Sequence, residues 1–179
     1  MIIDIFDKSE IEDLTRILFF FNEQICPAKE VADGVNIQEC YHDFFAHMLE
    51  KEKTGNFDIG ISFQKQKEMY DQISESTFNQ IWFFGESLRF NSPDAFSEKY
   101  IFFTNNGKYW KFLEEFGKEN ANIKKYFDTL YLTGDMSPTV VSNILYAFEW
   151  CDTEDVRIQL LIAIHYLTLN DQFERREKY

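Results

Sequence analysis

The chain has 179 residues, 45% of them hydrophobic and 27% charged, which is the composition of a globular protein and not of a disordered one. It carries 18 Lys and Arg against 31 Asp and Glu, so its formal net charge is −13. A field of this sign repels phosphate backbones and anionic lipids, which argues against direct binding to nucleic acid or to a membrane surface. It favours encounter with a basic partner, although solubility alone also explains it.

The aromatic content indicates a bulky core, because the chain contains 20 Phe, 9 Tyr and 3 Trp. Only 7 Gly and 3 Pro are present, too few for a loop-rich all-β sandwich. The length predicts a single domain over residues 1–179. We therefore expect an all-α protein with an aromatic-rich core.

The cysteines and the apolar runs bear on localisation. Cys26, Cys40 and Cys151 are odd in number and form no CxxC, so the sequence predicts buried free thiols in a reducing compartment. The N-terminus has no long apolar run, and the longest apolar stretch, 160–169, is too short to span a bilayer. We expect a cytoplasmic protein.

The first half of the chain contains clear helix signals. Ser9 and Glu12 have the spacing of a capping box, an apolar stripe of helical period follows, and Pro27 closes this element. Asn36 opens the next helix, which carries an apolar face from Ile37 to Met48. Two helices are thus predicted before residue 55.

Residues 56–90 are ambiguous. Phe57, Ile59 and Ile61 alternate, which is typical of a short strand or an extended connector. Ranges 63–73 and 78–88 favour helices, the second capped by Thr77. The run 81–84 is also compatible with a buried strand, because short apolar runs do not reveal their period. Helix is the preferred interpretation.

After residue 91, Ser92 and Ser137 each precede a Pro at a first helical position. The first of these helices is expected to end at Asn105, Asn106 and Gly107, with a hairpin turn as the alternative. Three further helices show apolar stripes over 109–116, 123–131 and 141–148. A last helix, capped by Asp152 and Thr153, is apolar on nearly every side, which predicts a central position.

Together these signals predict a compact domain of about eight or nine helices, joined by short loops that place successive helices antiparallel and adjacent. The last pair, whose second helix opens with Asp155, Val156 and Arg157, resembles one HEAT-type helical hairpin, but no repeat period accompanies it. The charged tail, 173–179, is expected to fray.

The residues offer little catalytic chemistry. Glu39 and His42 form one E-x-x-H motif of the kind that supplies metal ligands in helical bundles, but such sites need two copies and the carboxylates here fall on the solvent side. Asp43 and His47 fit a solvated surface pair. His165 lies on the most apolar helix and is expected to be buried and neutral. No nucleophile motif or phosphate-binding loop is found in the sequence, so we expect no catalytic residue, no metal and no cofactor.

The remaining candidate is an acidic corner between the last two helices. Its carboxylates cap a helix, and with Trp150 they also form a possible contact patch for a basic partner. The residues concerned are Glu149, Trp150, Asp152, Glu154 and Asp155.

Three functional hypotheses follow. The first is a non-catalytic, acidic protein-binding domain, such as an inhibitor or immunity protein that blocks a basic toxin or nuclease. The second is an enzyme whose site is assembled from distant residues around His42, His47 or His165. The third is a structural or scaffolding protein. The sequence does not indicate an oligomeric state.

Overall fold

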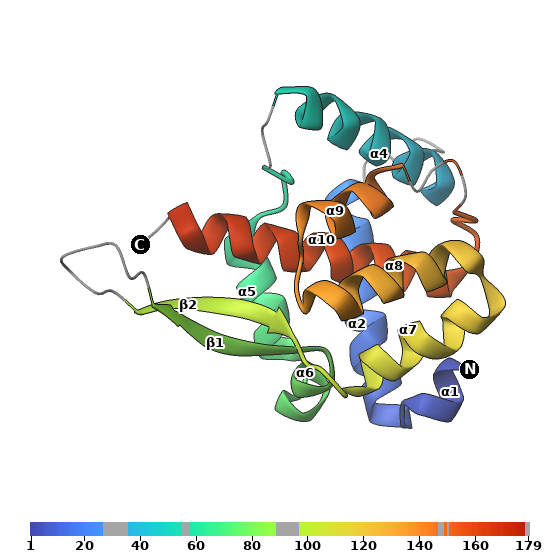
Figure 1. Cartoon of the computed structure of the whole chain (residues 1–179), viewed down its shortest axis with the longest axis vertical. Coiled ribbons are helices and arrows are strands. Elements are labelled where there is room, and N and C mark those ends of the chain that lie inside the picture. The colour runs from blue at the N-terminus through green and yellow to red at the C-terminus, as the bar shows by residue number, and fades with distance from the viewer. Residues whose placement is uncertain (27–35, 55–57, 89–96, 147–148, 150, 178–179) are drawn as a thin grey trace.

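The computed structural model describes residues 1–26, 36–54, 58–88, 97–146, 149 and 151–177 (Figure 1). Nine helices and one two-stranded sheet lie within these residues, in agreement with the predicted helical class. In chain order they are α1 (Ile2–Ile5), α2 (Lys8–Ile25), α4 (Ile37–Thr54), α5 (Phe63–Gln72), α6 (Glu75–Ile81), β1 (Trp82–Leu88), β2 (Ser97–Phe103), α7 (Lys108–Glu119), α8 (Ala121–Thr133), α9 (Pro138–Leu145) and α10 (Val156–Glu177).

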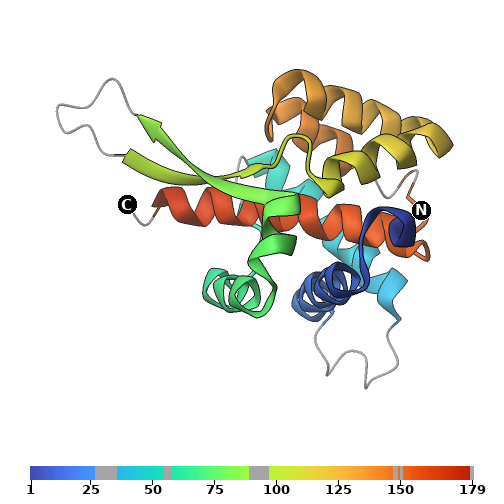
Figure 2. The same cartoon turned by 90° about the horizontal axis from the view of Figure 1, so that it is seen from below.

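Helix α10 crosses the middle of the molecule. In Figure 2, α2 and α5 lie on one side of it and α7, α8 and α9 on the other. Side chains from Ile158 to Leu167 are almost all buried, because this helix is apolar around its circumference and neighbours cover every side. The predicted central position of the last helix is therefore confirmed.

Most predicted helices are present, although some of their caps differ. The box that starts α2 is formed by Asp7 and Glu10, not by Ser9 and Glu12. Likewise Ser74 caps α6, while Thr77 lies one turn inside that helix. The observed cap lies two residues before the predicted one in α2 and three residues before it in α6, and in each case its side chain accepts from an amide of the first turn.

Other caps agree with the sequence. The Asn36 side chain accepts from the Glu39 amide at 2.9 Å at the start of α4, and the Ser137 hydroxyl accepts from the Val140 amide at the start of α9. Gly134 ends α8 with a φ of 72°, in the left-handed region that glycine adopts without strain. Pro27, Phe57 and the Ser92–Pro93 signal lie outside the described residues.

The main correction concerns residues 82–88 and 97–103, which pair as the two antiparallel strands of a β-hairpin where helices were preferred. Trp82 pairs with Phe103, Phe84 with Ile101, and Glu86 with Lys99. Trp82, Ile101 and Phe103 face the core and are buried, whereas Phe83 faces outward. Aromatic side chains on both strands hide the alternation in hydropathy, because outward positions such as Phe83 and Phe102 are apolar too.

The turn at Asn106 is correspondingly reassigned. Asn106 adopts a φ of 70°, but it follows β2 and does not end a helix. Gly107 is then the N-cap of α7. The turn joins β2 to α7, so neither the predicted helix end nor the alternative hairpin turn is observed.

In the C-terminal half, α7 and α8 pack side by side as a helical hairpin joined at Asn120 (Figures 1 and 2). By contrast, α10 packs chiefly on α2, α5 and β2. Residues 173–177, expected to fray, continue α10 to Glu177. The Arg175–Asp171 ion pair, at 2.7 Å, holds this last part of the helix.

The cysteine prediction is wrong for two of the three residues. Cys26, at the end of α2, and Cys40, in the first turn of α4, form a buried disulfide. Only Cys151 is a free thiol within the described residues, and burial raises its pKa to about 12. Disulfides persist in oxidising compartments, so the cysteines no longer support the prediction of a cytoplasmic protein.

Loss of the disulfide is expected to destabilise the protein. Its sequence separation of 14 residues corresponds to a stabilisation of about 3 kcal/mol through the unfolded chain. The double variant Cys26→Ala/Cys40→Ala should lose about this much in urea unfolding, and a reductant should then have no further effect. Cys151→Ala serves as the control, whose response to reductant should match the wild type.

Gly107 joins the hairpin to α7 at a close approach. A Cβ atom at Gly107 would overlap the backbone carbonyl oxygen of Gln80. The Gln80 side chain also accepts a hydrogen bond from the Lys108 amide at 3.0 Å, which fixes Gln80 in this place. Gly107→Ala should therefore cost about 1–3 kcal/mol in the free energy of unfolding. The exposed neighbour variant Asn105→Ala should stay within about 0.5 kcal/mol of the wild type.

Candidate functional site

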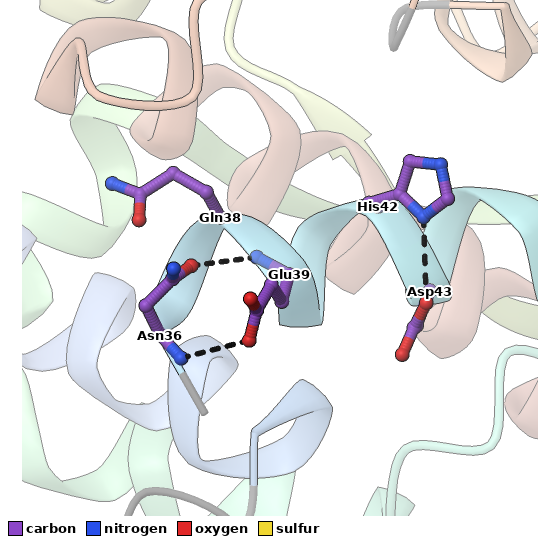
Figure 3. A pocket seen from close by; sticks show the side chains of 5 residues that line it. All are labelled: Asn36, Gln38, Glu39, His42 and Asp43. Atoms are coloured by element: carbon purple, nitrogen blue, oxygen red, sulfur yellow. Dashed lines mark hydrogen bonds and ion pairs between the residues drawn. The ribbon is translucent and has the colours of Figure 1, made fainter. Parts of the chain in front are cut away.

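The E-x-x-H pair lies on the exposed side of α4, in a shallow pocket lined by Asn36, Gln38, Glu39, His42 and Asp43 (Figure 3). Figure 3 shows that Glu39 turns back to the Asn36 amide as part of the helix cap, while His42 turns to Asp43 at 3.4 Å. The two side chains do not converge. Within the part of the chain that the structure describes, no three His, Cys, Asp or Glu side chains gather as metal ligands.

The predicted Asp43–His47 pair is replaced by this contact between Asp43 and His42, whose side chains are both exposed. A solvated pair of this kind contributes little to stability. Among the residues that the structure describes, His42 and His47 do not belong to any group of three His, Cys, Asp or Glu side chains that could hold a metal ion.

The acidic corner is only partly an open patch. Asp155 is engaged by the Arg157 guanidinium at 2.7–3.0 Å, and Arg157 also reaches Glu119 at 2.7 Å. These contacts join α10 to the end of α7, and hydrogen bonds from Arg157 hold the pKa of Asp155 below its usual value despite the opposing effect of burial. Glu149, Asp152 and Glu154 are exposed, and Trp150 lies outside the described residues.

His165 is buried in the core, as expected. Its Nδ1 lies 3.1 Å from the Tyr126 hydroxyl, and among the described residues Nε2 has no hydrogen-bond partner. Burial lowers the pKa of His165 to about 3, so the ring is neutral at physiological pH. Its surroundings are aromatic, since the centroids of the His165 and Tyr166 rings lie 5.0 Å apart, and the side chain is not exposed to solvent.

The feature that the sequence analysis missed is the outward face of the β-hairpin. Phe83 on β1 and Phe102 on β2 are directly paired and stack at 5.4 Å, and Tyr100 continues the row 6.2 Å from Phe102. Phe83 is 44% exposed, and the other two rings are partly exposed. We call Phe83, Tyr100 and Phe102 the aromatic face.

Gly85 shapes this face. It pairs directly with Tyr100, and a Cβ atom there would come within 2.9 Å of the Phe102 ring. The missing side chain lets that ring lie flat across the strand. Three rings therefore form one continuous surface in place of three separate side chains.

The hairpin is fixed to the body through its inner face and its β2 edge. The Trp82 indole donates to the Thr168 hydroxyl at 2.8 Å, and the Gln172 amide donates to the Ile101 carbonyl at 3.0 Å. The Arg175 guanidinium lies 4.7 Å from the Phe84 ring and makes two 2.7 Å contacts with Asp171. These contacts hold the aromatic face in place without covering it.

Asp171 belongs to a buried polar cluster under the hairpin. Its side chain is fully buried, and burial raises its pKa although the Arg175 guanidinium opposes the shift. Gln66 donates both to the Tyr70 hydroxyl and to the Leu167 carbonyl, which ties α5 to α10. Each of these contacts has a structural effect, namely the placement of α5 and of the hairpin on α10.

Comparison of the chain with models of known protein families, with curated proteins and with solved structures found no match to any of them. No helix within the described residues combines the length and apolarity that crossing a membrane requires. The function must therefore be argued from the surface that the fold presents.

The buried His165 should make the protein acid-sensitive. An unfolded His takes up a proton near pH 6.5, whereas the folded one does so only near pH 3, so the free energy of unfolding falls as pH decreases between these values. His165→Gln should reduce the slope by up to about 1.4 kcal/mol per pH unit between pH 6 and 4. Urea unfolding at several pH values measures this slope. An equal reduction in the exposed control His42→Gln would contradict the assignment.

Proposed function

We propose that this chain is a non-catalytic protein-binding domain that blocks a basic partner, in the manner of an inhibitor or immunity protein. The observation that carries the proposal is the aromatic face on a hairpin set against the side of an acidic helical body. Exposed aromatic clusters of this kind are typical anchors of protein interfaces, since large rigid rings bury much area at a small entropic cost.

The charge gives the partner its chemistry. A net charge of −13 attracts a basic protein over a distance of about a Debye length and accelerates the encounter, while the aromatic face then supplies contact area. Carboxylates on the domain would stand in for the phosphates that a toxin or nuclease site expects. Occlusion by the bound domain would stop the partner from acting.

The alternative classes have less support. A catalytic reading needs histidines and carboxylates that converge, but His42 is exposed on α4 and His165 is enclosed by aromatic rings in the core. A scaffolding protein built from repeats would expose apolar surfaces at both ends of the repeat array. The described helices are instead grouped around one central helix, α10.

The test compares three tagged forms of the chain, each used to retain proteins from the native lysate: the wild type, a double variant and a control variant. The double variant Phe83→Ser/Phe102→Ser removes the aromatic face, and Phe19→Ser, which changes an exposed aromatic residue on α2, is the matched control. The wild type and the control should retain the same basic protein, and the double variant should bind it at least tenfold more weakly once the partner is purified.

Salt adds a second readout, because the affinity should fall as ionic strength rises. Equal affinity in all three forms would overturn the proposal, as would retention of no basic protein from a lysate that expresses candidate partners. Thermal unfolding of the double variant is measured alongside. An unchanged transition temperature shows that the loss of affinity comes from the surface and not from the fold.

A further inference from the structure

The backbone of the hairpin defines two edges of different character. The Thr104 amide donates to the Ile81 carbonyl at 2.9 Å, so Ile81 and Thr104 form a hydrogen-bonded pair. In an antiparallel ladder, every second pair along the register is then also hydrogen-bonded. Phe83–Phe102 and Gly85–Tyr100 therefore bond within the hairpin. Phe84 and Glu86 on β1, like Ile101 on β2, direct their backbone groups outward.

The outer edge of β2 is occupied. Helix α10 packs against β2, and the Gln172 side chain donates to the outward carbonyl of Ile101 at 3.0 Å. An additional strand cannot pair there without displacing α10. This edge is closed by the fold itself.

Among the described residues, no strand pairs with the outer edge of β1. The outward amide of Trp82 is used by the Phe78 carbonyl where α6 ends. Beyond that point, the amides and carbonyls of Phe84 and Glu86 have no partner among the residues that the structure describes. Apart from β2, the element that β1 chiefly packs against is α6, from which it starts. An uncovered strand edge is a template for pairing with another chain.

We propose that β1 binds an extended segment of the basic partner as a third, edge strand, through the outward amides and carbonyls of Phe84 and Glu86. This inference rests on the proposed function and deepens it, because it names how the partner is held. Main-chain hydrogen bonds supply affinity in such complexes, and the alternating side chains of the added strand supply specificity.

The register also gives the chemistry of that segment. Side chains on one face of the added strand lie beside Phe83 and Gly85, next to the aromatic face, and suit aliphatic residues. Those on the other face lie beside Phe84 and Glu86. The Lys99 and Arg175 cations already lie over the Phe84 ring, so the position beside the exposed Glu86 carboxylate is the one that suits Lys or Arg. The expected ligand is an extended segment that alternates aliphatic and basic residues.

The test probe is a synthetic eight-residue peptide of alternating Val and Lys, added to the full isotope-labelled chain. A second peptide with N-methyl groups on its pairing amides serves as the control, because it has the same charge and cannot form a strand pair. The first peptide should shift and protect the amides of Phe84 and Glu86, and it should bind at least tenfold more tightly than the second.

Two variants at one position separate backbone pairing from charge. Glu86→Pro removes the outward amide, and Glu86→Thr keeps it while removing the same carboxylate; neither touches a hydrogen bond within the hairpin. The Pro variant should bind the unmethylated peptide at least tenfold more weakly than the Thr variant. If the hairpin of the Pro variant does not fold, the difference in affinity of the wild-type chain for the two peptides still tests strand pairing.

Several results would overturn the inference. These are absence of peptide binding, equal binding of the two peptides, or amide changes away from β1. A dimer in sedimentation with Phe84 and Glu86 protected would mean that a second copy fills the edge. If Glu86→Pro binds the purified partner as well as Glu86→Thr while loss of the aromatic face abolishes binding, strand addition fails and the proposed function stands. If the aromatic face is dispensable, the proposed function itself fails.

Discussion

Helix α10 places polar side chains in the middle of the molecule, and the positions of its neighbours depend on how those groups are satisfied. Its first half is apolar, but Thr168, Asn170, Asp171 and Gln172 in the second half are buried as well. A buried polar group without a hydrogen-bond partner costs free energy. Each element that packs on α10 must therefore take the one position in which it supplies such a partner. Helix α5 meets Asn170 through Gln66, and the hairpin meets Thr168 and Gln172. The core therefore specifies an arrangement as well as providing stability.

The sequence predicts the helices whose polar and apolar faces alternate clearly, such as α2, α7 and α8, and it predicts the burial of α10. It fails at the hairpin, because the outward Phe83 is as apolar as the inward Trp82 and the period of two disappears. The run from Tyr100 to Phe103, aromatic and β-branched, was the available signal for a strand. The disulfide was missed for another reason: pairing depends on where α2 and α4 meet in space, which three irregularly spaced cysteines do not encode.

The candidate site illustrates the same limit. The negative net charge and the lack of catalytic motifs can be seen in the sequence, and they led to a protein-binding hypothesis centred on the acidic corner. In the structure Asp155 of that corner is engaged by Arg157, and an exposed aromatic cluster that the sequence analysis did not identify lies on the hairpin. A surface formed by two strands needs their register, and the register is set by contacts with α10 that are distant in sequence.

The bond between Cys26 and Cys40 also changes how the chain responds to cleavage. A protease that cuts between these two residues leaves α1 and α2 covalently attached to everything that follows. Apart from the water added at the cut, the nicked molecule would remain one covalently linked molecule until a reductant separates the pieces. Because α2 packs directly on α10, it would also keep the contacts that surround the central helix. A break at this place therefore need not release the N-terminal helices from the fold.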